Sequence, residues 1–140
     1  MIEQYQADIS KILKETRTIA VVGLSPKGAR PSHQVAQYLI EQGYTIFPVN
    51  PGQDSILGLS CYPDLQSVPA QIDVIDIFRN PKYVPGIVDS AIEIGAKVVW
   101  MQLGIVHEDA AAKARSAGLI VVMDRCIKVD HQQQLCGRIA

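Results

Sequence analysis

The sequence has few cysteines, no long apolar run and no excess of basic residues, and each absence excludes a class of protein. Its three cysteines form no Cys-x-x-Cys pair, which indicates reduced thiols in a cytoplasmic protein. Residues 1–16 are too polar for a secretory signal, and no later stretch reads as a membrane span. The formal net charge of −1 excludes a general attraction to nucleic acids or membrane surfaces, since both require a basic excess.

Catalytic and metal-binding patterns are also absent from the sequence. No Ser/His/Asp or Cys/His arrangement is recognisable, and His131 and Cys136 do not have the spacing of zinc ligands. We therefore predict no catalytic residue and no metal site. Asp76 is unusual because it lies inside an apolar run, where a carboxylate costs several kcal/mol unless it is paired. We expect it to bond to a neighbouring loop.

Five short apolar runs, rich in β-branched residues, are separated by segments with helical spacing. The runs are residues 18–22, 45–49, 74–78, 98–101 and 119–123. Continuous runs are typical of strands buried on both faces of a parallel sheet, and their alternation with helices predicts right-handed βαβ units. The 140 residues suffice for a single domain. We predict an α/β fold, a Rossmann-like doubly wound parallel sheet with strand order 3-2-1-4-5 between two helical layers.

Start and stop signals place the helices. Ser32 is a suitable N-cap for a helix that ends near Gln42, and Gly43 is its stop signal. Further helices are predicted over residues 84–94 and 108–117, each followed by glycine, and over residues 2–15 near the N-terminus. Residues 51–63 read mostly as loop, and we assign no element to the tail 131–140.

The loop after the first predicted strand is the leading candidate for a functional site. Doubly wound sheets bind ligands outside the carboxyl ends of their strands where the strand order reverses, which is predicted here between the first and fourth strands. Residues 23–30 lead from the first strand into a helix, so backbone N–H groups and a helix N-terminus point at one place. That arrangement suits a phosphate. The alternative is a plain strand–helix turn.

Cationic and polar residues follow several of the strands. The basic candidates for a phosphate contact are Lys27, Arg30, His33 and Arg79. Asn50 and Pro51 either begin a turn or line a pocket for adenine or ribose, and Phe78 belongs either to the core or to a pocket wall. Gln102 follows the fourth strand, where its amide can donate and accept hydrogen bonds, whereas Trp100 is assigned to the core.

A dinucleotide is the first ligand to consider for such a loop. Residues 23–28 match the G-x-G-x-x-G fingerprint only if Ser25 takes the place of the second glycine, and Pro26 removes one N–H donor. The second strand ends in Val49 and Asn50, without the Asp or Glu that usually binds the ribose. NAD and NADP therefore fit less well, and an NAD(P)-dependent oxidoreductase, or another nucleotide-binding enzyme, is the alternative function.

Five motifs, in order at these strand ends, resemble the small single-domain bacterial CoA-binding proteins. They are Gly-Leu-Ser-Pro at 23–26, Arg-Pro-Ser at 30–32, Val-Asn-Pro at 49–51, Trp-Met-Gln-Leu-Gly at 100–104 and Met-Asp-Arg-Cys at 123–126. The fold of those proteins is similar to the N-terminal CoA-binding domain of the succinyl-CoA synthetase α subunit. The resemblance covers about residues 18–129.

The resemblance implies that coenzyme A or an acyl-CoA lies across the carboxyl edge of the sheet. The positions that match the synthetase's phosphate loop are Gly23, Leu24, Ser25, Pro26 and Lys27. The positions that match its fourth-strand contact are Met101, Gln102 and Leu103. Gln53 stands where the synthetase has a lysine, a loss for which Lys27 or Arg30 could compensate, and Ile127 stands where the small proteins often have proline. We predict a carrier or sensor module without catalysis of its own.

Cys126 lies close to this predicted site. Its thiol could form a mixed disulfide with the thiol of CoA, and the alternative is a small buried apolar residue. Arg125 would lower the pKa of this thiol only if the two side chains faced each other, which their adjacency in sequence does not establish.

Overall fold

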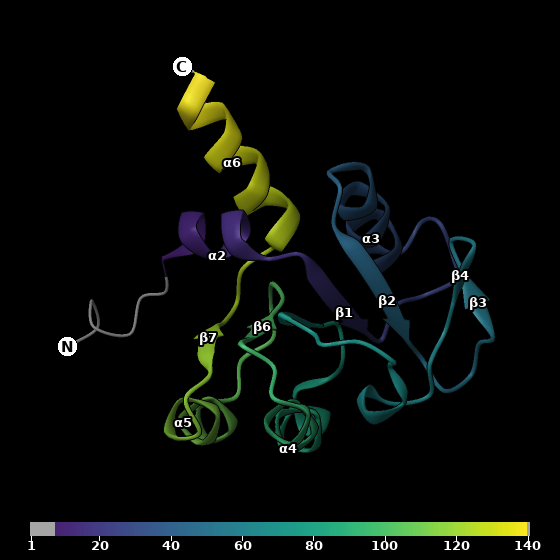
Figure 1. The fold of residues 1–140 in the computed structure, drawn as a ribbon, viewed down its shortest axis with the longest axis vertical. Coiled ribbons are helices and arrows are strands. Elements are labelled where there is room, and N and C mark those ends of the chain that lie inside the picture. Colours follow the sequence, from purple (N-terminus) through teal and green to yellow (C-terminus); the bar gives the residue numbers. More distant parts are fainter. Residues whose placement is uncertain (1–7, 140) are drawn as a thin grey trace.

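A five-stranded parallel sheet forms the centre of the computed structural model, which describes residues 8–139 (Figure 1). Its strands are β1 (Thr18–Val22), β2 (Thr45–Val49), β5 (Val74–Ile77), β6 (Val98–Met101) and β7 (Ile120–Val122). A short antiparallel hairpin beside β2 consists of β3 (Ser55–Ile56) and β4 (Leu59–Ser60). The helices are α2 (Ile9–Glu15), α3 (Pro31–Glu41), α4 (Val84–Ile94), α5 (Glu108–Ser116) and α6 (Ile127–Ile139), with 3-10 turns η1 (Leu65–Ser67) and η2 (Pro81–Tyr83).

All five predicted strands are present, and their burial explains why the apolar runs are continuous. Every residue of β5 and β6 is buried, because helices cover both faces of the sheet. On one face, α4 and α5 pack against the sheet through residues such as Val88 and Ala111. On the other face, α2, α3 and α6 pack through residues such as Leu13, Leu39 and Ile127. The α/β architecture with two helical layers is thus confirmed.

The predicted strand order is wrong in one respect. The observed order is β2-β1-β5-β6-β7, so the third strand of the chain lies beside the first and not beyond the second. The cause is the connection 50–73, whose Leu65, Val68 and Ile72 join the core on the α4 side. A right-handed crossover on that face carries the chain back past β1 and not outward from β2. The order therefore reverses between β1 and β5, not between the first and fourth strands.

Several helix boundaries also differ from those predicted. Helix α3 begins at Pro31 with Arg30 as its N-cap, because proline suits the first helical position and Ser32 already lies inside the helix. Helix α6 extends over residues 131–139, to which the sequence assigned no element, and the β3–β4 hairpin lies within the predicted loop 51–63. Helix α2 confirms residues 9–15 of the predicted N-terminal helix, and residues 2–7 lie outside the described part of the chain.

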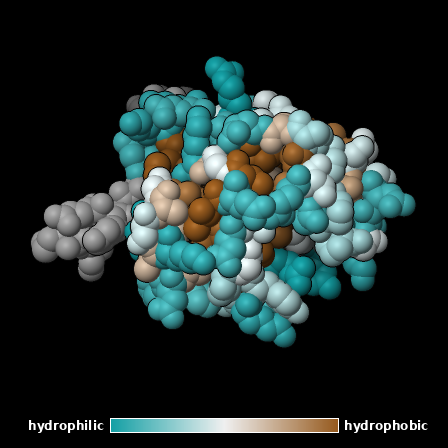
Figure 2. Space-filling model, turned by 60° about the horizontal axis from the view of Figure 1, so that its bottom comes forward, coloured by the Kyte–Doolittle hydropathy of each residue, from teal (hydrophilic) through white to brown (hydrophobic). Residues whose placement is uncertain are grey.

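The surface on the α4 and α5 side is mixed in character. Figure 2 brings this side forward and shows apolar surface gathered near its middle, with hydrophilic residues around it. No helix within residues 8–139 is long and apolar enough to cross a membrane.

Candidate functional site

The β1 loop, residues 23–30, begins where the strand order reverses. Gly23 has a φ of +89°, and a Cβ atom there would lie 2.5 Å from the Phe78 carbonyl oxygen. Its N–H donates to the Val49 carbonyl over 2.9 Å. Glycine is therefore required for two reasons, the left-handed backbone and the close approach of β5. The loop is fixed at its start between the ends of β2 and β5.

Hydrogen bonds inside the loop determine which groups remain for a ligand. The Ser25 N–H donates to Ser32 Oγ over 2.9 Å, and His33 Nδ1 lies 2.9 Å from the Ser25 carbonyl oxygen. The Lys27 N–H donates to Ser25 Oγ over 3.1 Å. His33, which the sequence offered as a phosphate contact, therefore contacts the backbone of the β1 loop.

The second half of the β1 loop, residues 26–30, is exposed and offers polar groups to a ligand. Among residues 8–139, the backbone N–H groups of the exposed residues Gly28 and Ala29 donate to no protein acceptor. The side chains of Lys27 and Arg30 are exposed, and so is Pro26. Free N–H donors next to two exposed cations form a suitable environment for an anion.

A cavity of about 300 Å³ opens beside this loop, between the ends of β1 and β2, the η1 connection and the start of α4. Its walls are largely apolar and include Val22, Val49 and Ile87. Its polar lining comes from Asp64, Arg79, Tyr83 and Ser90. Pro51, one of the predicted site residues, also lines it. The sequence did not indicate the contributions of η1 and α4, because they depend on the strand order that was predicted incorrectly.

Arg79 is held at this cavity by an aromatic ring. Its guanidinium carbon lies 4.1 Å from the centroid of Tyr83, and Lys82 Nζ lies 5.1 Å from the same centroid. Such contacts orient a guanidinium without neutralising it. Phe78, the preceding residue, is half-buried and packs against the core on the α3 side. Of the two predicted residues after β5, only Arg79 therefore lines the cavity.

Asn50 joins the β1 and β2 loops. Its Nδ2 donates to the Leu24 carbonyl and its Oδ1 accepts from the Gly52 N–H, both over 2.9 Å. The sequence predicted either a turn or a pocket wall, and the Gly52 bond shows the turn. The bond to Leu24 joins two segments that are 26 residues apart in sequence.

On the other side of the site, the ends of β6 and β7 are bound tightly to each other. Gln102 is only 4% exposed, and its Oε1 accepts from the Ile127 N–H at the start of α6. Met101 is fully buried, whereas Leu103 is 71% exposed. The structure therefore presents only the Leu103 side chain of this predicted trio at the surface. Contacts of Met101 and Gln102 with a ligand stay predictions.

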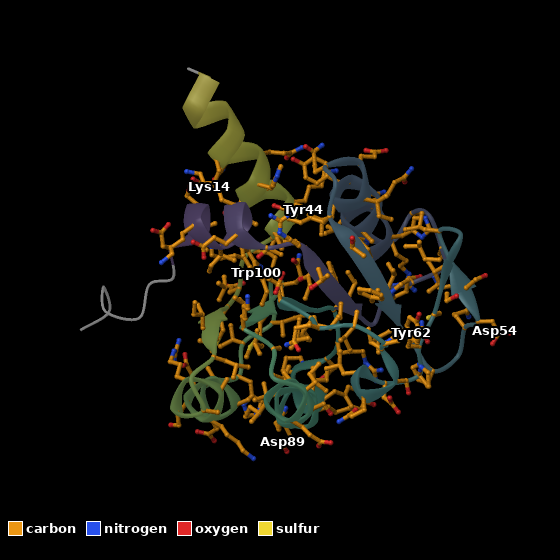
Figure 3. All side chains as sticks on the ribbon, in the orientation of Figure 1. Lys14, Tyr44, Asp54, Tyr62, Asp89 and Trp100 are labelled. Carbon is orange, nitrogen blue, oxygen red and sulfur yellow. The ribbon has the colours of Figure 1, made fainter. Side chains whose placement is uncertain are left out.

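The loop after β7 is held by Trp100 and by a left-handed residue. The Trp100 indole N–H donates to the Arg125 carbonyl over 2.8 Å, in the interior of the molecule (Figure 3). Asp124 has a φ of +58°, and its Oδ1 accepts from the Gly104 N–H over 2.7 Å. Asp tolerates this backbone better than most residues, which is the only signal in the sequence for its role. Trp100 lies in the core, as predicted.

Asp76 differs from its prediction. It is fully buried in the middle of β5, and neither of its carboxyl oxygens has a hydrogen-bond partner in the described part of the chain. The expected bond to a neighbouring loop is therefore wrong, because its strand neighbours in the sheet are Val21 and Trp100. Burial raises the pKa of the Asp76 carboxyl well above its usual range. The side chain is neutral in the folded protein over that extended range.

The cysteines and the acidic residues form no metal site in residues 8–139. Cys61 and Cys126 are free thiols and both are half-buried. Cys61 donates to the Asn50 carbonyl over 3.4 Å. Cys126 lies at the start of α6, packed against the core on that side. Cys136 lies in the last turns of α6, beyond the described side chains.

Comparisons with known proteins agree with this geometry. A family model described as a CoA binding domain matches residues 17–132. The protein YneT of Bacillus subtilis (strain 168) is 40% identical over 126 residues, which cover 90% of this chain and 93% of YneT. The solved structure of a hypothetical protein from Pyrococcus horikoshii OT3 is similar with a TM-score of 0.90 and 44% identity, over 91% of this chain and 90% of that chain. The ADP-forming acetate–CoA ligase II of Archaeoglobus fulgidus is 32% identical over 83 residues, which are 58% of this chain and 12% of the ligase.

Proposed function

This chain belongs to the CoA binding domain family, as its resemblance to single-domain CoA-binding proteins predicted, and we propose that it binds coenzyme A or a short acyl-CoA across the carboxyl edge of its sheet. The observation that carries the proposal is the β1 loop at the reversal of strand order. There, free N–H groups and exposed cations lie beside an apolar cavity. Open parallel sheets bind their ligands at this position.

The length of the edge suits an extended ligand. Five parallel strands span four intervals of about 4.8 Å, or roughly 19 Å in total. CoA consists of a nucleotide, a pyrophosphate and a long flexible arm that ends in a thiol. We assign the nucleotide to the β2–β1 end of the edge and the arm to the β6–β7 end. The arm would then pass Leu103, which is the most exposed large apolar residue in the described part of the chain.

The phosphates belong to the β1 loop in this proposal. Gly23 and Ser25 shape the loop, and Pro26 is exposed. In the described part of the chain, the exposed N–H groups of Gly28 and Ala29 are unpartnered. Lys27 and Arg30 supply positive charge, and Arg79 supplies a third cation from the loop after β5. Hydrogen bonds to a charged group contribute about 1.5–3 kcal/mol each, so two or three of them support micromolar affinity after the ordering costs.

The cavity suits the adenine ring. A flat aromatic base fills apolar space between Val49, Pro51 and Ile87, while its polar edge meets Ser90 or Asp64. Arg79 at the Tyr83 ring is close enough to the same cavity to pair with a phosphate on the adjoining ribose. Asn50 lies between Val49 and Pro51, which both line the cavity, and so helps to place this part of the wall.

We assign the protein the role of a carrier or sensor module without catalysis of its own. The support comes from the ligase of Archaeoglobus fulgidus, in which the matching segment is 12% of a much longer chain. The chemistry named for that enzyme therefore has many other residues available to it. The two free thiols Cys61 and Cys126 favour a reducing compartment, the cytoplasm, for this module.

Titration calorimetry with CoA tests the proposal, with dephospho-CoA and NADH as comparison ligands. We expect CoA to bind with micromolar affinity and NADH to bind at least tenfold more weakly, because β2 is followed by Asn50 and not by a ribose-binding carboxylate. Native mass spectra of protein purified without added ligand complement the titration, since a CoA mass lost on denaturation shows non-covalent binding. Absence of CoA binding at millimolar concentration would overturn the proposal.

A further inference from the structure

The side chain of Asn50 is fully engaged with the protein. Its Nδ2 donates to the Leu24 carbonyl and its Oδ1 accepts from the Gly52 N–H. A backbone carbonyl can only accept and a backbone N–H can only donate, so the orientation of the amide is determined by its partners. Of the side chains of this size, only an amide supplies a donor and an acceptor in these two directions.

The main chain of Asn50 is engaged as well. Its N–H donates to the Tyr62 carbonyl over 2.9 Å, and its carbonyl accepts from the Gln53 N–H over 3.3 Å. The same carbonyl accepts from the Cys61 thiol, and burial raises the pKa of that thiol, which keeps its proton in place for the bond. Asn50 is therefore immobilised on both sides of its Cα atom. Its side chain therefore fixes the position of the Leu24 carbonyl, to which it is bonded.

What Asn50 holds is the peptide between Leu24 and Ser25, at the start of the β1 loop. The Leu24 side chain is fully buried, and its carbonyl is bound to Asn50, so the residue is fixed at two points. The Ser25 N–H of the same peptide donates to Ser32 Oγ, so the peptide is bound both to the end of β2 and to α3. Asn50 itself lies between Val49 and Pro51, which both line the cavity. One side chain thus connects the cavity wall to the β1 loop.

We propose that Asn50 is a positioning residue, which sets the β1 loop in its ligand-binding form without touching the ligand. The proposal rests on the proposed function in one respect only, namely that the ligand of the loop is CoA. Without the Leu24 bond, the peptide between Leu24 and Ser25 keeps only the bond from the Ser25 N–H to Ser32 Oγ. The start of the loop then loses its link to the end of β2 and must be ordered when the ligand binds. That ordering cost lowers affinity even though no contact with the ligand is removed.

Asn50→Asp is the most informative variant. A carboxylate has the same shape and still accepts from the Gly52 N–H, so the turn at 50–53 is kept. It has no donor for the Leu24 carbonyl and repels that oxygen. Asn80→Asp is the matched control, because the Asn80 Oδ1 accepts from the Lys82 N–H over 3.0 Å in a similar turn, and a carboxylate retains that bond. Both variants add one negative charge at a strand end.

The variants are compared by amide NMR of the ligand-free protein and by CoA titration. We expect Asn50→Asp to shift the amide signals of residues 23–27 before any ligand is added, and to weaken CoA binding at least tenfold. The control should leave those signals unchanged and bind CoA within threefold of the unmodified protein. Asn50→Ala, which removes both bonds without adding charge, should move the same signals if Asn50→Asp does not fold.

Two results would overturn the positioning role. Unchanged amide signals in ligand-free Asn50→Asp would show that the loop does not depend on the Leu24 bond. Weaker CoA binding with unchanged signals would show direct contact between Asn50 and the ligand. If the unmodified protein binds no CoA, the proposed function fails, and the amide comparison in ligand-free protein still decides the role of Asn50.

Discussion

The buried carboxyl of Asp76 predicts an unusual dependence of stability on pH. Asp76 lies in the centre of β5, fully buried, with Val21 and Trp100 as its neighbours on the adjoining strands. Neither oxygen has a partner within residues 8–139, and burial raises the pKa of the carboxyl well above its usual range. In the unfolded chain, the same group has a pKa of about 3.9.

The sign and the size of the effect follow from proton binding. Because the folded pKa is the higher one, the folded chain keeps a proton that the unfolded chain releases. Stabilisation from this group is complete below the unfolded pKa and is lost as the pH rises toward the folded pKa. Over that interval, each pH unit lowers the free energy of unfolding by about 1.4 kcal/mol.

Asp76→Asn removes the proton equilibrium and keeps the shape of the side chain. We expect the free energy of unfolding of the unmodified protein to fall more steeply with pH than that of the variant, by about 1.4 kcal/mol per unit between the unfolded pKa near 4 and the raised folded pKa. Urea unfolding at each pH unit from 4 to 8 measures both slopes, and the contributions of other groups cancel in the difference. The comparison uses slopes because the variant also buries an amide, which changes the absolute stability.

Asp89→Asn is the control for this experiment. Asp89 is an exposed residue of α4 that pairs with Lys113, and its side chain is 55% exposed. A pair in that position contributes little, so its removal should leave the pH slope unchanged. If the slopes of the unmodified protein and Asp76→Asn are parallel, the carboxyl is either ionised in the fold or paired, and the reasoning is refuted.

Three further predictions concern the site and its supports. Arg30→Ala should weaken CoA binding by about 1–3 kcal/mol in calorimetry without a change in melting temperature, and equal affinity would remove Arg30 from the site. Gly23→Ala should lower the free energy of unfolding by roughly 2–4 kcal/mol in urea titrations, because its Cβ would lie 2.5 Å from the Phe78 carbonyl oxygen at a positive φ; a smaller loss would mean that β5 yields easily. Asp130→Asn should cost about 1–2 kcal/mol, since Asp130 is 4% exposed and accepts two hydrogen bonds from Arg125, and an unchanged melting curve would contradict this.

The sequence predicted the strands well because strands buried on both faces appear in the sequence as continuous apolar runs. Residues 98–101 are apolar without interruption, and β6 is buried at every position. The order of the strands in the sheet has no comparable pattern in the sequence. It depends on which face the connection 50–73 covers, and Leu65 and Val68 could have packed on either face as far as their spacing shows. The helix cap at Arg30 was missed because Ser32 satisfies the local rule for capping, whereas in the structure its Oγ accepts from the Ser25 N–H.

The same limit applies to the candidate site. Gly23 and the basic residues around it were predicted because a strand that ends in glycine before a helix is a local pattern. The cavity was not predicted, since Tyr83 and Ile87 reach it only when β5 lies beside β1. Asn50 was recognised as a polar residue at a strand end, but its bond to Leu24 links distant segments. No pattern within one segment predicts such a bond.

The position of Trp100 gives this protein a built-in optical reporter. It is the only tryptophan in the sequence, so all indole fluorescence comes from one known place. Its ring is fully shielded from water, and its N–H is bonded to the backbone of the β7 loop. Emission at short wavelength therefore signals an intact β6–β7 corner, and a red shift signals that water has entered it. Unfolding, and any rearrangement of that corner on ligand binding, can thus be followed without attaching a dye.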